Sequence, residues 1–217
     1  RVDIFPNACP ANFLNAYRKY CDSDLKAVAV ISNHPPREII ELLDLLQSDG
    51  VSVDLIGIDG KSLRVTPEVL SLYSAVITIG KTVQYCLATG TPVFCYDHFG
   101  GPGWITLESF DAARRRNFSG RCTPLRRTAK NILAELRSGF SVVLNQREAL
   151  RGFAETHFNL TENLLNVLDA ASRSSLVVSL SATDREILSR QSSLFSNLRQ
   201  IIRNHQQAAG ERDVKIS

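Results

Sequence analysis

The chain has no methionine, a single tryptophan and no apolar run that approaches the about 18 residues of a membrane-spanning helix. Its five cysteines form no Cys-x-x-Cys pair, so the sequence predicts neither a zinc site nor a disulfide framework. No secretory signal is visible at the start, and a reducing, cytoplasmic location is the simpler interpretation of the scattered cysteines. Because methionine is absent and the chain opens with Arg1, Val2 and Asp3, we expect it to be a piece of a longer protein.

The common phosphate-binding signatures are absent too. The chain contains no G-x-x-x-x-G-K-[ST] motif, and no G-x-G-x-x-G motif follows any expected strand. Classical NAD binding and kinase-type ATP binding therefore lose support. No cluster of histidine, cysteine and aspartate has the spacing of metal ligands, so we expect neither a metal nor a cofactor.

The composition is that of a globular protein, with 44% apolar residues, 22% charged residues and a formal net charge of +3. In the first half of the chain, short β-branched runs alternate with amphipathic stretches, which is typical of a parallel sheet with helical crossovers. The sequence therefore predicts an α/β fold with a doubly wound, Rossmann-like parallel sheet. The expected strands are 27–31, 51–56, 75–79 and 92–96, with a shorter one at 2–5. The expected helices are 11–20, one through Ile39 and Leu46 that stops at Gly50, one that begins at Thr66 and Pro67, and 81–89.

From about Thr106 onward the strand signals fade, and helices follow one another. Asn159 is predicted to cap one of them, while Val177–Leu180 is too short to assign. The expected helices are 124–138, 145–157 and 161–171.

A last helix is expected to begin near Ser181 or Thr183, with Thr183 and Glu186 as a capping box, and to run to about Gln206. It carries an apolar stripe in which Ile187, Leu194 and Ile201 recur every seven residues. Such a stripe needs burial, either within a larger protein or in a homodimer.

These patterns together predict two parts of the chain. The first is a Rossmann-like domain over residues 1–172, and the second is a helical extension over residues 173–217.

Four loops follow the four main expected strands, and all four are polar or contain glycine. In an open parallel sheet, ligands bind beyond the carboxyl ends of the strands, so we expect these loops to form one site. They are Ser32–His34, Gly57–Gly60, Gly80–Thr82 and Asp97–Gly103.

The loop at Gly80 carries the clearest signal for a ligand. Gly80 lets a ligand approach the backbone without a Cβ in the way, and the helix that follows presents unpaired N–H groups with a partial positive charge. Lys81 adds a full charge and Thr82 a hydroxyl donor. The sequence thus predicts a phosphate site at Gly80, Lys81 and Thr82. A plainer alternative stays open, in which Gly80 only permits a tight turn and Lys81 is solvated.

Polar residues and glycines also follow the fourth strand. Asp97 and His98 are candidates to orient a sugar hydroxyl or an acceptor, with Gly100 and Gly101 in the same loop. The alternative is that Asp97 caps a turn and His98 is an exposed loop residue. The adjacent Trp104 is predicted to fill the core rather than to offer a stacking platform.

One longer pattern joins these features: an apolar strand, Gly80, a helix, then Gly90-Thr91-Pro92-Val93 and another strand. It resembles the nucleotide-binding, C-terminal half of GT-B glycosyltransferases and the related UDP-N-acetylglucosamine 2-epimerases. The opening stretch VDIFPNACP and the later pair Gly100-Gly101 are similar to segments of the same family. The resemblance covers roughly residues 1–110.

The resemblance implies that the chain is the donor-binding half of a glycosyltransferase. Its substrate would be a nucleoside-diphosphate sugar, such as a UDP-sugar, with the diphosphate on the backbone N–H groups of Gly80–Thr82. The glutamate that usually holds the ribose in this family is replaced here by Tyr85, and Ser32-Asn33-His34 stands where many members have an Arg/Lys pair. Contacts to the ribose and base are therefore expected from Gln84, Tyr85, Ser32, Asn33 and His34.

The family divides its active site between two domains, so the resemblance also implies an N-terminal partner domain and an inactive fragment. The implied acceptor is a glycan, a cell-surface polysaccharide or a lipid-linked molecule. Two other functions stay open: a non-catalytic Rossmann-like assembly module, and a sugar-nucleotide epimerase-like domain with the same phosphate site.

Residues 112–130 are strongly basic. They are candidates to touch anionic lipid headgroups or a lipid-diphosphate acceptor at the inner membrane face, although a solvated helix face is the favoured interpretation. No known nucleic-acid motif accompanies them, so nucleic-acid binding is not expected. The basic residues are Arg114, Arg115, Arg116, Arg121, Arg126, Arg127 and Lys130.

Overall fold

A computed structural model describes residues 7–17, 22–173 and 181–214. The chain divides into two compact units, residues 1–169 and 170–217. The expected strand at 2–5 and the stretch Val177–Leu180 lie outside the described residues. In chain order the first unit contains α1 (Ala11–Leu14), β1 (Ala27–Ile31), α2 (Arg37–Ser48), β2 (Ser52–Ile56), α3 (Pro67–Leu70), β3 (Ala75–Thr78), α4 (Lys81–Thr89), β4 (Val93–Asp97), β5 (Gly100–Trp104), α5 (Phe110–Arg115), the 3-10 turn η1 (Gly120–Cys122) and α6 (Ala129–Phe158). Helix α7 (Leu160–Ser172) crosses the division, and α8 (Ala182–Val214) belongs to the second unit.

The sheet has five strands in the order β2-β1-β3-β4-β5. The first four are parallel, and β5 pairs antiparallel with β4. The fold is therefore α/β with a mostly parallel sheet flanked by helices, compatible with the Rossmann-like architecture. After β2 the chain returns past β1 to form β3 on its other side, so the strand order reverses between β1 and β3. In sheets of this kind such a reversal leaves a crevice at the carboxyl ends of the two strands.

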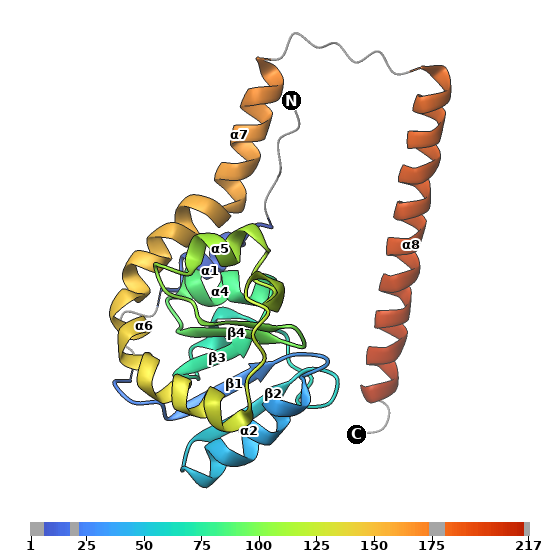
Figure 1. The fold of residues 1–217 in the computed structure, drawn as a ribbon. Coiled ribbons are helices and arrows are strands. Elements are labelled where there is room, and N and C mark those ends of the chain that lie inside the picture. The colour runs from blue at the N-terminus through green and yellow to red at the C-terminus, as the bar shows by residue number, and fades with distance from the viewer. Residues whose placement is uncertain (1–6, 18–21, 174–180, 215–217) are drawn as a thin grey trace. The chain divides into compact units, whose positions relative to one another are not determined.

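Helices cover both faces of the sheet. Figure 1 shows α2 on one side, and α1, α4 and α5 on the other. The 30-residue helix α6 packs against both α2 and α4 and against the edge strand β5. An ion pair of 2.6 Å between Arg137 and Asp49 joins α6 to the end of α2.

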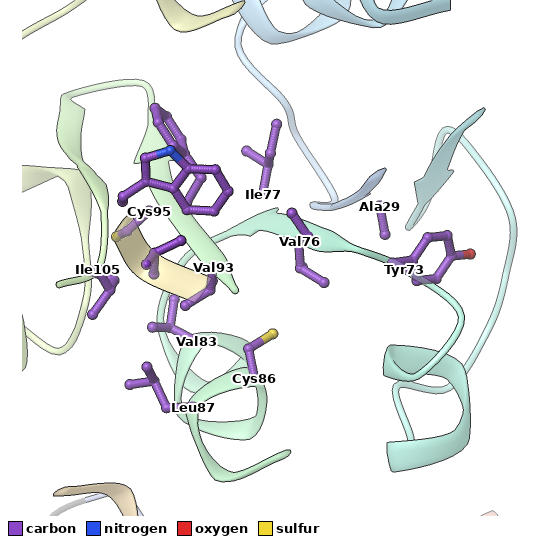
Figure 2. Packing of buried hydrophobic residues seen from close by; sticks show 14 of the residues in the cluster. Ala29, Tyr73, Val76, Ile77, Val83, Cys86, Leu87, Val93, Cys95 and Ile105 are labelled. Carbon is purple, nitrogen blue, oxygen red and sulfur yellow. The ribbon is translucent and has the colours of Figure 1, made fainter. Parts of the chain in front are cut away.

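The core consists of the apolar runs that predicted the inner strands. Every residue of β3 and β4 is buried, as expected for parallel strands with helices on both faces. Figure 2 shows Val76 and Ile77 of β3 pointing to opposite faces, with Val83 and Leu87 of α4 turned toward the sheet. By contrast, only one end of β2 is buried, because β2 lies at the edge of the sheet.

Trp104 is a core residue, as predicted. Its ring lies edge-on to Phe94 at 5.5 Å between centroids and tilted against Phe140 at 5.9 Å. Its indole N–H donates to the carbonyl oxygen of Glu135 at 3.1 Å. Gly139 allows this contact, because a Cβ there would collide with the indole ring.

Local signals placed most helix ends correctly. The Thr66 hydroxyl accepts a hydrogen bond from Val69 N–H at 3.3 Å and caps α3. Gly50 has a φ of 78° where α2 ends. Asn159 accepts hydrogen bonds from two N–H groups at the start of α7, which confirms its capping role.

Three helix predictions were wrong in their limits. The expected helix 11–20 ends at Leu14. The expected helices 124–138 and 145–157 form one continuous helix, α6, which begins at Ala129 after the Thr128 cap. No break occurs between them, because Phe140 and Val143 are buried in the core and tertiary packing holds the backbone helical.

Helix α8 begins at Ala182, as expected, but its capping box and its end differ from the prediction. Its capping box is formed by Ser181 and Asp184, not by Thr183 and Glu186: Ser181 N–H donates to the Asp184 carboxylate at 3.1 Å, and Asp184 N–H donates to the Ser181 hydroxyl at 3.1 Å. The helix extends to Val214 instead of Gln206. None of the helices in the described ranges is both long enough and apolar enough to span a bilayer.

The glycine-rich stretch after β4 is not the open loop that was expected. Residues Gly100–Trp104 form strand β5, and a tight turn at His98 and Phe99 joins it to β4. Sequence patterns missed this strand because Gly-Gly-Pro-Gly offers none of the side chains that mark a strand.

Candidate functional site

A pocket of about 530 Å³ opens at the carboxyl ends of the parallel strands. It lies where the strand order reverses, and each of the four loops predicted to form a site contributes to its wall. The loop after β2 contributes through Gly57. The other predicted site residues that line the pocket are Ser32, Asn33, His34, Thr82, Asp97 and His98.

The first turn of α4 forms one side of this pocket. Gly80 precedes it with φ 64° and ψ −132°, a conformation that only glycine adopts without strain, and an added Cβ there would meet nothing within 4 Å. The Gly80 N–H is already donated to Phe118 O at 2.9 Å, so Gly80 supplies conformation and open space rather than an amide donor. Within the described residues, the N–H groups of Lys81 and Thr82 have no hydrogen-bond partner. These two amides are therefore available to an anion.

Lys81 and Tyr85 lie on another side of α4. The Lys81 ammonium is 5.7 Å from the centroid of the Tyr85 ring, and that ring stacks on Phe13 of α1 at 4.0 Å between centroids. Neither residue lines the pocket. The structure thus places Tyr85 in a packing contact with α1, apart from the Ser32–His34 loop, which lines the pocket.

Gln84 is also turned away from the pocket. Its side chain is 2% exposed, and its amide N–H donates to the Asn117 side chain at 3.4 Å. Its carbonyl oxygen Oε1 is buried and has no partner among the residues the structure describes. The structure does not bring Gln84 together with Ser32, Asn33 and His34.

The mouth of the pocket lies at the end of β4, around Asp97 and His98. The Asp97 carboxylate holds the backbone there by hydrogen bonds. One carboxylate oxygen accepts from Phe99 N–H at 2.7 Å, and the other accepts from Gly120 N–H at 2.9 Å. Its neighbour His98 is exposed, and its Nε2 is 2.8 Å from the carbonyl oxygen of His34. Asp97 therefore holds the turn, as the plainer alternative expected, while still lining the pocket.

The three glycines around this mouth are required by close packing. A Cβ on Gly100 would collide with the backbone of Leu125, and one on Gly101 with the carbonyl of Cys95. Neither Gly100 nor Gly101 lines the pocket. A Cβ on Gly57 would collide with the carbonyl of Ser32, so Gly57 lets the loops after β1 and β2 touch.

Apolar residues that sequence patterns did not single out complete the pocket. Leu63 and Val65 reach it from the loop between β2 and α3. That loop is closed by an ion pair of 2.6 Å between Lys61 and Asp54. The Tyr73 hydroxyl donates to the same carboxylate at 2.7 Å. Hydrogen bonds from Lys61 and Tyr73 lower the pKa of Asp54, while burial and the bond to Asp54 raise the pKa of Tyr73 to about 12.

Tyr96 connects the pocket to the segment before α6. It lines the pocket and donates its hydroxyl proton to Glu38 at 3.0 Å, while its oxygen accepts from Arg127 N–H at 2.9 Å. Arg126 donates to both oxygens of Glu38 at 3.0 Å. Burial alone would raise the pKa of Glu38, but its hydrogen bonds to its own backbone, Tyr96 and Arg126 outweigh burial and lower it.

The Glu38 network predicts an acid-dependent loss of stability. Replacing Glu38 with glutamine is expected to lower the free energy of unfolding by about 1–2 kcal/mol at pH 7. The contribution of a carboxyl with a lowered pKa is present above its ordinary pKa and is lost as the pH falls through the lowered value. The deficit should therefore shrink in urea unfolding series taken from pH 7 to pH 3. Glu41→Gln is the matched control, because the ion pair of Glu41 within the described ranges is the exposed one with Arg37. An equal deficit at both ends of the pH series would contradict the ionic role of Glu38.

The basic stretch of residues 112–130 is partly neutralised. Arg114 pairs with Asp111, Arg126 with Glu38, and Arg127 with Glu135. Arg121 differs, because its guanidinium lies 4.2 Å from the centroid of the Phe99 ring. Three of the seven basic residues in this stretch therefore have acidic partners among the described residues.

Comparison with protein-family models, with curated proteins and with solved structures gives no match. The class of protein is therefore defined by the fold and the site alone: an α/β protein with a mostly parallel sheet and a pocket at its strand-order reversal.

Proposed function

We propose that the pocket binds a nucleoside-diphosphate sugar, and that the chain is the donor-binding half of a GT-B-like glycosyltransferase with a doubly wound sheet. The observation that carries the proposal is the convergence of four separate loops on one pocket beside the free amides of α4. Ligands of open α/β sheets bind at this place, and a helix start with unpaired N–H groups favours an anion there.

The pocket offers different chemistry at its floor and its rim. Ile39, Ile77 and Tyr96 give the floor an apolar character suited to a base. Polar backbone and side chains from Ser32–His34 lie at the rim and can fix a base or ribose by hydrogen bonds. The diphosphate would then lie against Lys81 N–H, Thr82 N–H and the Thr82 hydroxyl.

This placement assigns a chemical role to the start of α4. In glycosyl transfer the leaving nucleoside diphosphate gains negative charge as the bond to the sugar breaks. Oriented N–H donors stabilise such charge without reorganising during the reaction. The acceptor in the proposal is a glycan or polysaccharide, and the catalytic base would come from outside the described residues.

Calorimetric titration of the chain with UDP, GDP and their sugars tests the proposal. We expect one of the two diphosphates to bind with a stoichiometry near one, and the corresponding nucleoside to bind more weakly. No heat with any nucleotide at millimolar concentration would contradict the proposal and would favour the assembly-module alternative. Product analysis on the full-length protein, with the sugar nucleotide that binds, would distinguish transfer to an acceptor from epimerisation.

A further inference from the structure

The pocket contains a carboxylate but no cation, although its proposed ligand is an anion. No lysine or arginine is among its described lining residues, whereas Asp97 is. Lys81 follows the phosphate-binding turn directly, yet its ammonium lies over the Tyr85 ring, away from the pocket. A diphosphate held at Thr82 would therefore need a positive charge from another element.

The segment from Asn117 to Cys122 is hydrogen-bonded on both sides of the mouth, at the start of α4 and at the end of β4. The Phe118 carbonyl accepts from Gly80 N–H at 2.9 Å, at the start of α4. Two residues further on, Gly120 N–H donates to Asp97 at the end of β4. Asn117 and Phe118 have φ values of 52° and 53°, and in the described chain all other residues with positive φ are glycines. Such strain persists where surrounding contacts hold it, and it clusters at binding sites.

Arg121 belongs to this hydrogen-bonded segment. It follows Gly120, and it is separated from Phe118 by at most about 11 Å of chain. Its guanidinium lies over Phe99, a half-exposed residue in the turn next to His98, which lines the pocket. No carboxylate of the described residues is within 4.0 Å of it, unlike Arg114, Arg126 and Arg127 with their acidic partners.

We propose that Arg121 is the cation of the site and moves from the Phe99 ring to the diphosphate when ligand binds. The inference rests on the proposed function, and it adds a binding residue from a segment that sequence patterns did not connect with the phosphate. An arginine can form two parallel hydrogen bonds to phosphate oxygens, which are stronger than an exposed contact with an aromatic ring. The Phe99 ring thus holds the Arg121 side chain near the mouth of the pocket while no ligand is bound.

The test compares nucleosides with their diphosphates in calorimetric titrations of the full chain. Arg121→Gln is expected to weaken binding of UDP or GDP by about tenfold and to leave binding of uridine or guanosine unchanged. The salt dependence of diphosphate binding should decrease as well. Arg115→Gln is the matched control, because Arg115 is an exposed arginine on α5 that does not line the pocket. Arg121→Lys should retain part of the affinity, since it keeps the charge but not the paired hydrogen bonds.

Each result decides between the two proposals. Equal diphosphate affinity in the wild type and Arg121→Gln would overturn the role of Arg121 and leave the proposed function standing. Equal losses for the nucleoside and the diphosphate would also overturn it, because Arg121 would then act on the shape of the pocket. Failure of the wild type to bind any of the four probes would overturn the proposed function and this inference together.

Discussion

Asp97→Ala is expected to lower the free energy of unfolding by about 3–5 kcal/mol. The Asp97 carboxylate is nearly buried, and its two oxygens accept from Phe99 N–H and Gly120 N–H. Alanine would leave both donors unpaired at the turn where β4, β5 and η1 meet. Urea unfolding at pH 7 measures the loss directly.

Two further variants separate this role from a general effect of charge. Asp111→Ala removes an exposed carboxylate whose ion pair among the described residues is with Arg114, so its effect should stay below about 0.5 kcal/mol. Asp97→Asn keeps one acceptor oxygen but turns an N–H₂ group toward a donor, so an intermediate loss is expected. A loss below about 1 kcal/mol for Asp97→Ala would show that the turn does not depend on this carboxylate.

Gly80→Ala is expected to weaken binding of the nucleoside diphosphate by about 30-fold, or ~2 kcal/mol. No atom would meet the new Cβ, so the effect comes from backbone strain at φ 64° and ψ −132°. Relief of that strain would reorient the Lys81 and Thr82 N–H groups that face the proposed diphosphate. Titration calorimetry at a temperature where the variant is fully folded measures the change.

Gly50→Ala provides a closely matched control for this variant. Gly50 also has a positive φ, of 78°, and also has nothing within 4 Å of an added Cβ. It follows α2 and precedes β2, and it does not line the pocket. Both variants should lose about 1–3 kcal/mol of stability, but only Gly80→Ala should lose affinity. Equal affinities in the two variants would argue against a ligand at the start of α4.

The sheet could be predicted from sequence because its inner strands are buried on both faces. Continuous apolar runs rich in β-branched residues, such as Ala27–Ile31, indicate a buried strand, and Gly50 or Thr66 marks a helix end by its own chemistry. Strand β5 has no such signal. Its residues Gly100–Trp104 form a strand because β4 offers an open edge and because glycines fit against Cys95 and Leu125.

The position of the site was predictable for the same geometric reason. Parallel strands end at one edge, so the loops after β1, β3 and β4 had to meet, and Ser32, Thr82 and Asp97 do line one pocket. The directions of side chains along α4 were not predictable. They depend on segments distant in the sequence, since Phe13 stacks on Tyr85 and Asn117 binds Gln84.

Sequence patterns also did not predict which residues bind the backbone and side chains at the mouth of the pocket. Asn117 and Phe118 have positive φ values although neither is a glycine, so the sequence gives no sign of this conformation. Only the folded chain brings Phe118 to Gly80, and Gly120 to Asp97. The proposed role of Arg121 at the pocket is therefore argued from these tertiary contacts and not from the charge of residues 112–130.

Amide nitrogen–proton correlation spectra of the full chain, recorded while UDP or GDP is added, test the central claim most directly. A diphosphate on the first turn of α4 should move the Lys81 and Thr82 amide signals most, with further shifts at Ser32–His34. The amide signal of Arg137, a residue of α6 that pairs with Asp49 at the end of α2, should change little. Shifts confined to other regions, or saturating nucleotide with the Lys81 and Thr82 signals unmoved, would contradict the claim.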